Sequence, residues 1–285
     1  MRLFLFLTLS ASAWAAAPDA KGIVERALLK DTRNNELLEK YTYVQAETER
    51  QLDAAGKVTS TTSKDFEVQR IYGIQHKTLV KKDGKPLPLK EQAAEKDRVD
   101  KLAARQARLS VTEREKQAND EAAKRRKRRE FLKDIPKAYD FQVVGEETVA
   151  GRPSWVIEAT PRSGYAATSM QTRVFKKMKA KFWIAKEIDQ IVRMEAEATD
   201  TVSFGFVLAR LNKGSRLTLE LMHVNNELWV PRMFRADVDA RLALVKKVRA
   251  SEEVQFSNFR KFSADSRVLP HSGQPEPSPT IFPPK

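Results

Sequence analysis

The side chains that most often perform chemistry are sparse in this chain of 285 residues. Cysteine is absent, which excludes thiol nucleophiles, thiolate metal sites and disulfides. The three histidines, His76, His223 and His271, are isolated from one another and from paired carboxylates, so they do not form a recognisable metal-binding pattern. No serine has a G-x-S-x-G setting. We therefore expect no metal, no cofactor and no enzymatic step.

One group of carboxylates raises the possibility of acid–base chemistry. Glu195, Glu197 and Asp200 follow one another closely along a predicted strand. A general acid and base would need two carboxylates in different environments. Residues alternating along a strand more often form a solvated face, so we interpret this group as a wet surface.

The densest charge in the chain is a run of six basic residues, in a protein whose net charge is +14. The run comprises Lys124, Arg125, Arg126, Lys127, Arg128 and Arg129. On a helix, six successive residues surround more than one turn, so they form a collar whose members repel one another. The run either binds an anionic partner, meaning phosphate-rich lipid or an acidic protein, or simply keeps one helix end in solvent.

Large apolar side chains recur at strand spacing in the second half of the chain. We take them as candidates for the lining of an apolar ligand cavity: Trp155, Trp183, Phe206, Leu217, Leu219, Leu221 and Trp229. The alternative is that they form an ordinary packed core. Strand alternation also means that the adjacent Phe182 and Trp183 cannot both face inward.

The first fifteen residues have the pattern of a secretory signal peptide. Arg2 precedes an apolar run, Leu3 to Leu9, and Ala13, Trp14 and Ala15 form an A-x-A cleavage site. The run is too short to span a bilayer, which takes about 20 residues. We expect an exported protein, periplasmic or secreted, and export makes nucleic acid an improbable partner for the basic run. The absence of cysteine also excludes a lipid-modified cysteine anchor.

The rest of the sequence predicts one mainly β domain over residues 18–262. An amphipathic helix is expected from Pro18 to about Leu38, capped by Asp19, with a pattern that allows a break near 32–35. Strands follow, and a helical hairpin is inserted at 88–134. Its helices are expected at about 89–108 and 112–132, with overlapping capping boxes that begin at Ser110 and Thr112. The hairpin is too polar to lie in a core.

Antiparallel strands are expected to follow the helical hairpin. Turn signals divide this region into predicted strands near 139–149, 153–160, 172–185, 189–201, 206–223, 227–238, 239–249 and 252–262. Six prolines after Ser263 indicate that residues 263–285 form a disordered tail.

Several short motifs in this order resemble a known superfamily. Gly151, Pro153 and Trp155 share one predicted strand, a Trp183-Ile184 pair lies in the next, and Trp229 and Pro231 lie in a later one. This order resembles the LolA/LolB-like outer-membrane lipoprotein-sorting proteins. The resemblance implies a curved antiparallel half-barrel packed on an N-terminal helix, whose apolar interior shelters the acyl chains of a lipoprotein.

Two functions from different classes therefore remain open. The first is a non-enzymatic periplasmic carrier or binder of lipid or lipidated protein. The second is an envelope scaffold whose filled core displays the basic hairpin to anionic lipid or to an acidic partner. A hydrolase of envelope polymers would need a polar cleft with perturbed carboxylates, and the sequence displays none.

Overall fold

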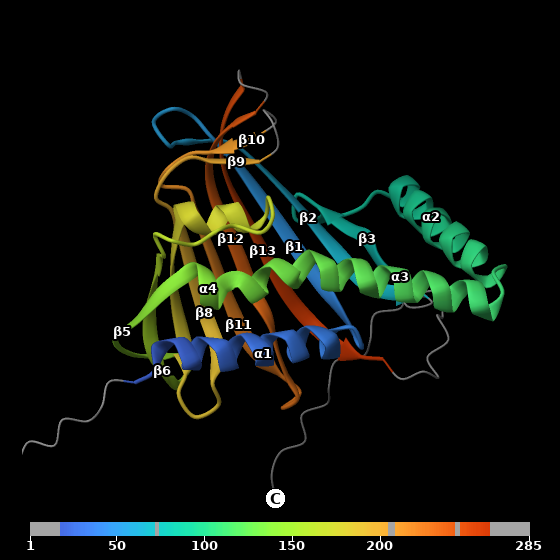
Figure 1. Cartoon of the computed structure of the whole chain (residues 1–285). Coiled ribbons are helices and arrows are strands. Elements are labelled where there is room, and N and C mark those ends of the chain that lie inside the picture. Colours follow the sequence, from blue (N-terminus) through green and yellow to red (C-terminus); the bar gives the residue numbers. More distant parts are fainter. Residues whose placement is uncertain (1–17, 72–73, 205–208, 243–245, 263–285) are drawn as a thin grey trace, which may run out of the picture.

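The computed structural model describes residues 18–71, 74–204, 209–242 and 246–262. Within them the strands form one open antiparallel sheet, in the order β4-β3-β2-β1-β13-β12-β11-β8-β7-β6-β5, with β9 and β10 attached through β12. Their bounds are β1 (Tyr41–Leu52), β2 (Val58–Ile71), β3 (Ile74–Lys82), β4 (Lys85–Pro86), β5 (Tyr139–Val149), β6 (Arg152–Pro161), β7 (Met178–Ala185), β8 (Gln190–Ala198), β9 (Val202–Phe204), β10 (Ala209–Leu211), β11 (Arg216–Val224), β12 (Leu228–Leu242) and β13 (Lys246–Lys261). The mainly β fold class, with a curved sheet packed on a helix, is confirmed (Figure 1).

All long helices lie on one side of this sheet. They are α1 (Ala20–Leu38), α2 (Leu89–Ala107) and α3 (Val111–Arg129), and α3 continues through the 3₁₀ turn η1 (Glu130–Asp134) into α4 (Ile135–Ala138). Figure 1 shows α1 and the α3–α4 segment crossing the sheet beside each other, with α2 at the edge near β3. A further 3₁₀ turn, η2 (Thr172–Lys177), precedes β7.

Helix α1 anchors the core. Asp19 caps it, because its Oδ1 accepts a hydrogen bond from the Gly22 amide at 3.0 Å. Ile23, Val24 and Ala27 recur at helical spacing and are buried in one cluster with residues of the sheet such as Ile157. The packing of α1 therefore covers the half of the sheet that contains β5 to β8.

The helix continues without a break through residues 32–35. The polar side chains there satisfy themselves within the helix or on the sheet. Thr32 Oγ1 donates to the Leu28 carbonyl at 3.1 Å, and Asn35 Nδ2 donates to the Asp31 carbonyl at 2.7 Å. Asn34 turns to the sheet, so this stretch strengthens the contact of α1 instead of ending it.

The basic helical hairpin is confirmed, and its polarity keeps it at the surface. No residue of α3 is buried, and only Gln106 is buried in α2. Helix α2 is attached to the edge of the sheet at β3, where Glu95 Oε2 accepts from the Leu79 amide at 3.2 Å and Arg98 Nη2 donates to the Lys77 carbonyl at 2.7 Å. These contacts occupy polar edge groups of β3 that would otherwise be open to pairing.

The N-terminus of α3 offers a first prediction. The expected capping box is present: the Ser110 side chain accepts from the Glu113 amide at 3.2 Å, and Glu113 Oε2 accepts from the Ser110 amide at 2.8 Å. Replacing Ser110 with alanine should cost α3 about 1 kcal/mol of local stability. Hydrogen exchange at the Glu113 amide should accelerate accordingly, whereas Ser110→Asp should restore protection. Unchanged exchange in Ser110→Ala would contradict the importance of the cap.

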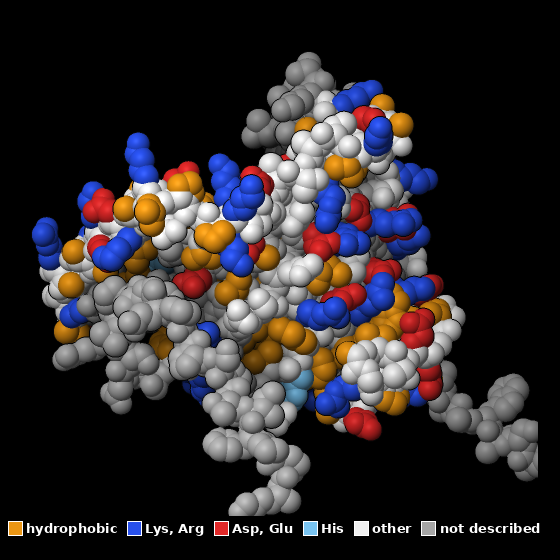
Figure 2. Space-filling model, turned by 180° about the vertical axis from the view of Figure 1, so that it is seen from behind, with side chains coloured by type: hydrophobic (Ala, Val, Ile, Leu, Met, Phe, Trp, Pro, Cys, Tyr) orange, Lys and Arg blue, Asp and Glu red, His pale blue; other side chains and the backbone are white. Residues whose placement is uncertain are grey.

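The opposite side of the sheet faces solvent, and its charged side chains form ion pairs. Figure 2, which views the molecule from behind, shows acidic and basic side chains mingled there. Glu197 lies 3.5 Å from both Lys179 and Arg216, and Asp200 lies 3.0 Å from Lys177. Glu195 pairs with Arg193. The three carboxylates considered for acid–base chemistry are thus held in ion pairs with exposed basic residues.

The strand boundaries differ from the expected ones in three places. The described part of the predicted strand 206–223 is divided, because β10 ends at Leu211 and β11 begins only at Arg216. The predicted strand 172–185 begins only at Met178, because the preceding residues form η2. The predicted strands 227–238 and 239–249 are replaced by the continuous strand β12 and the start of β13. No glycine or proline lies near Leu242, where β12 ends, so the sequence offered no local signal for that boundary. The predicted signal peptide at 1–15 and tail at 263–285 lie outside the described residues.

Candidate functional site

A large cavity lies between α1, the α3–α4 segment and the strands β1 to β3. Its volume is about 890 Å³, within the range of roughly 300–1,000 Å³ typical of small-molecule sites. Its apolar floor comes from both layers: Leu28 and Leu38 on α1, Tyr43 and Val68 on the sheet, and Leu132 of η1. Tyr43 stacks on Phe259 of β13 at a ring distance of 5.2 Å, which fixes the aromatic part of this floor.

The space exists because α3 lacks the side chains that would fill it. The α3 residues on the cavity side include Ala122, Arg125, Arg126 and Arg129, which follow one another at the three- and four-residue spacing of a helix face. In a closed core these positions would carry large apolar residues. Alanine is too small and arginine too polar to pack on the sheet, so α3 spans the floor without filling it.

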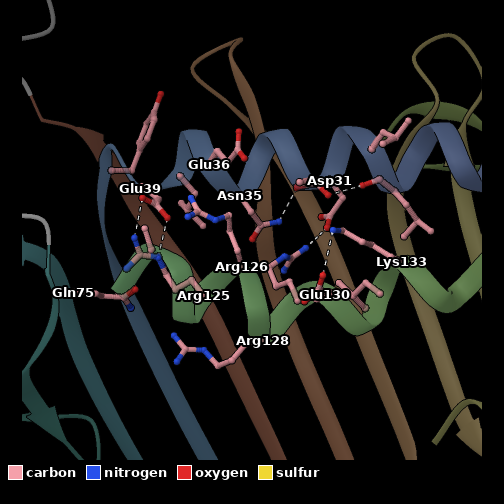
Figure 3. Close-up of a pocket in the computed structure, with 18 of the residues that line it drawn as sticks. Asp31, Asn35, Glu36, Glu39, Gln75, Arg125, Arg126, Arg128, Glu130 and Lys133 are labelled. Atoms are coloured by element: carbon pink, nitrogen blue, oxygen red, sulfur yellow. Dashed lines mark hydrogen bonds and ion pairs between the residues drawn. The ribbon is translucent and has the colours of Figure 1, made fainter. Parts of the chain in front are cut away.

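Two ion pairs hold α3 against α1 across the cavity. Arg125 Nε and Nη2 contact the two carboxylate oxygens of Glu39 at 2.8 and 3.0 Å, and Arg129 pairs with Asp31 (Figure 3). The Arg125 side chain is only 21% exposed. A bidentate guanidinium–carboxylate pair in such a setting fixes orientation as well as distance. The pairs therefore set the position of the cavity roof.

The Asp31 carboxylate is in an unfavourable setting. Burial raises the pKa of Asp31 above its ordinary value, although the charge and hydrogen bond of Arg129 and the hydrogen bond of Asn35 oppose that rise. Because the pKa is raised in the folded state, the stability contributed by Asp31 is fully present below its unfolded pKa. That contribution is lost as the pH rises through the folded-state pKa.

A pH series tests this arrangement. Relative to Asp31→Asn, the free energy of unfolding of the natural protein should fall as the pH rises from the ordinary aspartate pKa of 3.8 toward neutrality, as measured by urea unfolding. In Arg129→Met the pKa of Asp31 should rise further, because burial persists while the opposing charge is lost. A pKa at or below the ordinary value in a carbon-13 titration of Asp31 would contradict the expectation.

A second, smaller cavity of about 150 Å³ continues deeper toward the core. It shares Leu28, Leu38, Leu132 and the Asp31–Arg129 pair with the larger cavity. Asn35 also lines both cavities. The other walls of the smaller cavity are Asn34, Ile135 and strand residues from the centre of the sheet, namely Phe182, Ile191, Met194, Leu219, Leu221, Trp229 and Pro231.

The structure places the seven apolar candidates in different environments. Leu219, Leu221 and Trp229 line the smaller cavity, and none of the described candidates lines the larger one. Leu217 packs near Met178 in a separate cluster. Phe206 lies outside the described residues.

The two remaining candidates, Trp155 and Trp183, line neither of the described cavities. Trp155 packs beside the core with Lys186 Nζ 3.9 Å from its ring centre. Trp183 Nε1 donates to Glu147 at 2.8 Å, on the strand face opposite Phe182. Alternation thus resolves the adjacent pair: Phe182 faces the smaller cavity and Trp183 does not.

The basic run is divided between the cavity and solvent. Arg125, Arg126, Arg128 and Arg129 line the larger cavity, whereas Lys124 and Lys127 do not. Lys124 pairs with Glu121 at 2.7 Å on the exposed side of α3. The predicted collar of basic residues therefore faces the larger cavity on one side of α3 and solvent on the other.

Sequence reasoning missed the floor of the larger cavity. Leu28, Tyr43 and Val68 appeared as ordinary members of an amphipathic helix and two alternating strands. The only available signal was the contrast between the apolar inward faces of these elements and the polar hairpin above them. That contrast indicates that the polar hairpin cannot pack closely on these apolar faces, but it does not show where the resulting space lies.

The described ranges offer neither a metal-binding cluster nor a helix suited to crossing a membrane. They hold no group of three or more histidine, aspartate or glutamate side chains that could bind a metal ion. None of the helices described has the length and apolar character needed to cross a membrane.

No protein-family model matches the sequence, and no curated protein matches it either. Solved structures do match. The chain is similar to proteins of the LolA superfamily. The matches include a putative outer membrane lipoprotein-sorting protein domain from Vibrio parahaemolyticus, at 11% identity and a TM-score of 0.35, covering 90% of this chain and 96% of that one.

Two further matches are comparable. A LolA superfamily protein from Nitrosomonas europaea matches at 10% identity and a TM-score of 0.30, covering 87% of this chain and 95% of that one. A DUF1329 family protein from Desulfovibrio piger matches at 12% identity and a TM-score of 0.33, with the same coverage. Similarity at this level concerns the fold alone.

Proposed function

We propose that this protein is a periplasmic binder or carrier of lipid or lipidated protein and performs no chemical step. The observation that supports this function is the cavity of about 890 Å³ between α1, α3 and the sheet, with its apolar floor. Each buried CH₂ group contributes about 0.8 kcal/mol, so even a short acyl chain on this floor would be held strongly.

The arrangement of the walls fits an acyl chain better than a compact polar ligand. The floor runs from Val68 and Tyr43 on the sheet to Leu28 and Leu132, and from there the smaller cavity leads on toward Leu219. A flexible chain can follow such a path, because it needs continuous apolar contact and no fixed hydrogen bonds. The charged groups of the lining lie on α1, on the α3–α4 segment and, as Arg70, on β2.

Export of the chain, as its first fifteen residues predict, would place this cavity between two membranes. There a soluble shelter for acyl chains has a physical purpose, since water does not hold such chains.

A second candidate function is an envelope scaffold that docks through its helical hairpin. The observation in its favour is that Lys124 and Lys127 are exposed on α3 and line neither described cavity. Such docking to an anionic partner would be mainly electrostatic.

Salt dependence separates the two functions. Purified protein should retain co-extracted lipid and bind a fluorescent fatty-acyl probe with little change up to 1 M salt. Docking through the hairpin should instead collapse, because the screening length shortens to roughly 3 Å at that concentration. A folded protein that neither retains lipid nor binds the probe would contradict the carrier function.

A further inference from the structure

The larger cavity carries an excess of positive charge over an apolar floor. Its lining contains six basic residues against five acidic ones. The basic residues are Arg70, Arg125, Arg126, Arg128, Arg129 and Lys133, and the acidic ones are Glu25, Asp31, Glu36, Glu39 and Glu130. Glu25 lies 3.8 Å from Lys21, which is outside the lining. The effective excess is therefore larger than the count alone.

Two of the arginines have a structural task. Arg125 is occupied by Glu39 and Arg129 by Asp31, and these contacts tie α3 to α1. Among the charged lining residues, Lys133 lies 3.7 Å from Glu130, one turn away on the same segment. Each of these pairs has one basic and one acidic member, so the pairs do not account for the excess of positive charge in the lining.

Arg126 and Arg128 have no such task in the described part of the chain. Both are exposed and line the cavity, and neither lies in an ion pair with a described carboxylate. Glu121 is within electrostatic reach of Arg128, but its carboxylate contacts Lys124. Figure 3 shows Arg128 projecting from α3 away from α1, without a partner among the residues drawn.

The sheet adds a cation to the same cavity. Arg70 on β2 is half-buried, and burial lowers its pKa, with Glu39 opposing this effect and Arg125 adding to it. The positive charge of Arg70 is thus partly desolvated and close to a second guanidinium. An anion entering the cavity would relieve this repulsion.

We propose that the cavity selects amphiphiles with an anionic, phosphate-bearing head group, which Arg126 and Arg128 bind at the rim while the acyl chain lies on the apolar floor. This inference rests on the proposed function, since it specifies the class of lipid that the same cavity takes. Guanidinium groups suit the task because their planar donors bind phosphate oxygens in a bidentate manner. Arg70 contributes the field on the sheet side.

The test uses the full chain and two water-soluble lipids with identical dioctanoyl chains. Calorimetry should show that dioctanoyl phosphatidylglycerol binds about tenfold more tightly than dioctanoyl phosphatidylcholine, a difference of about 1.4 kcal/mol. In the double variant Arg126→Gln, Arg128→Gln this preference should disappear, because the affinity for phosphatidylglycerol falls to about that for phosphatidylcholine. The matched control is Lys124→Gln, Lys127→Gln, which removes equal charge from the same helix outside the cavity lining and should keep the preference.

The outcomes of this test distinguish a failure of acyl-chain binding from a failure of head-group selection. If the natural protein binds neither lipid, the acyl-binding function itself fails. If it binds both lipids equally, or if both double variants lose the preference alike, only the head-group inference is overturned. Inorganic phosphate provides the last arm: binding as tight as that of the anionic lipid would show that the arginines recognise free phosphate and not an amphiphile.

Discussion

Leu28→Trp is expected to weaken the binding of a fatty-acyl probe at least tenfold. Leu28 lines both cavities, at the place where the larger one leads into the smaller one. A tryptophan there would occupy space that the chain needs. Excluding only two CH₂ groups removes about 1.6 kcal/mol, and tenfold in affinity corresponds to about 1.4 kcal/mol. Fluorescence titration with the probe measures the effect directly.

The matched control for this substitution is Val58→Trp. Val58 begins β2, is 46% exposed and lines neither of the described cavities. The Val58→Trp substitution introduces the same side chain outside both described cavities, so it should not obstruct the acyl chain. Thermal unfolding of both variants guards against a loss of fold. Equal probe affinity in Leu28→Trp and the natural protein would place the acyl chain somewhere else.

Asn34→Ala is expected to lower the free energy of unfolding by about 2–4 kcal/mol. Asn34 is only 8% exposed and joins α1 to two strands. Its Nδ2 donates to Gln190 Oε1 at 2.9 Å, and its Oδ1 accepts from the Trp229 amide at 3.1 Å. Removing the amide leaves two buried polar groups without partners, at about 1–3 kcal/mol each. Urea unfolding measures the loss.

The neighbouring residue supplies the control. Asn35→Ala removes a hydrogen bond to the Asp31 carbonyl within the same helix, at a part-buried position, and this bond does not involve the sheet. We expect a loss below about 1 kcal/mol. If the two variants lose equal stability, the Asn34 contact would not be what attaches α1 to the sheet.

The local parts of this fold could be predicted from the sequence because local chemistry determines them. The Asp19 cap and the Ser110 capping box depend on residues within three positions of each other, and both are present. The polar stretch at 32–35 was the exception. Whether Asn34 breaks a helix or anchors it depends on Gln190, which is 156 residues away in the sequence.

The cavity could not be predicted, because it depends on how two helices meet. The sequence identified the basic run and the apolar strand residues as separate candidates. Arg125 meets Glu39 across 86 residues, and Arg129 meets Asp31 across 98. These contacts help to turn four of the six residues of the run toward the cavity. Residue types alone also did not reveal that the larger space lies over β1 to β3 and not beside Trp229.

The apolar candidates show the same limit on a smaller scale. Alternation established that Phe182 and Trp183 face opposite ways, but not which of them faces the helix side. The choice follows from the pairing of Phe182 with Met194 and from the contact between Trp183 and Glu147. The alternation of residues along a strand defines two faces, and the packing of α1 on one of them determines which face is buried.

Photo-crosslinking tests the central claim most directly. A fatty acid that carries a diazirine on its chain is bound to the full protein, irradiated, and its attachment sites are mapped by peptide mass spectrometry. If the cavity holds the acyl chain, the sites should include Leu28, Tyr43, Val68 and Leu132, and Leu28→Trp should abolish them. Attachment confined to the outer face of the sheet or to α2 would contradict the account.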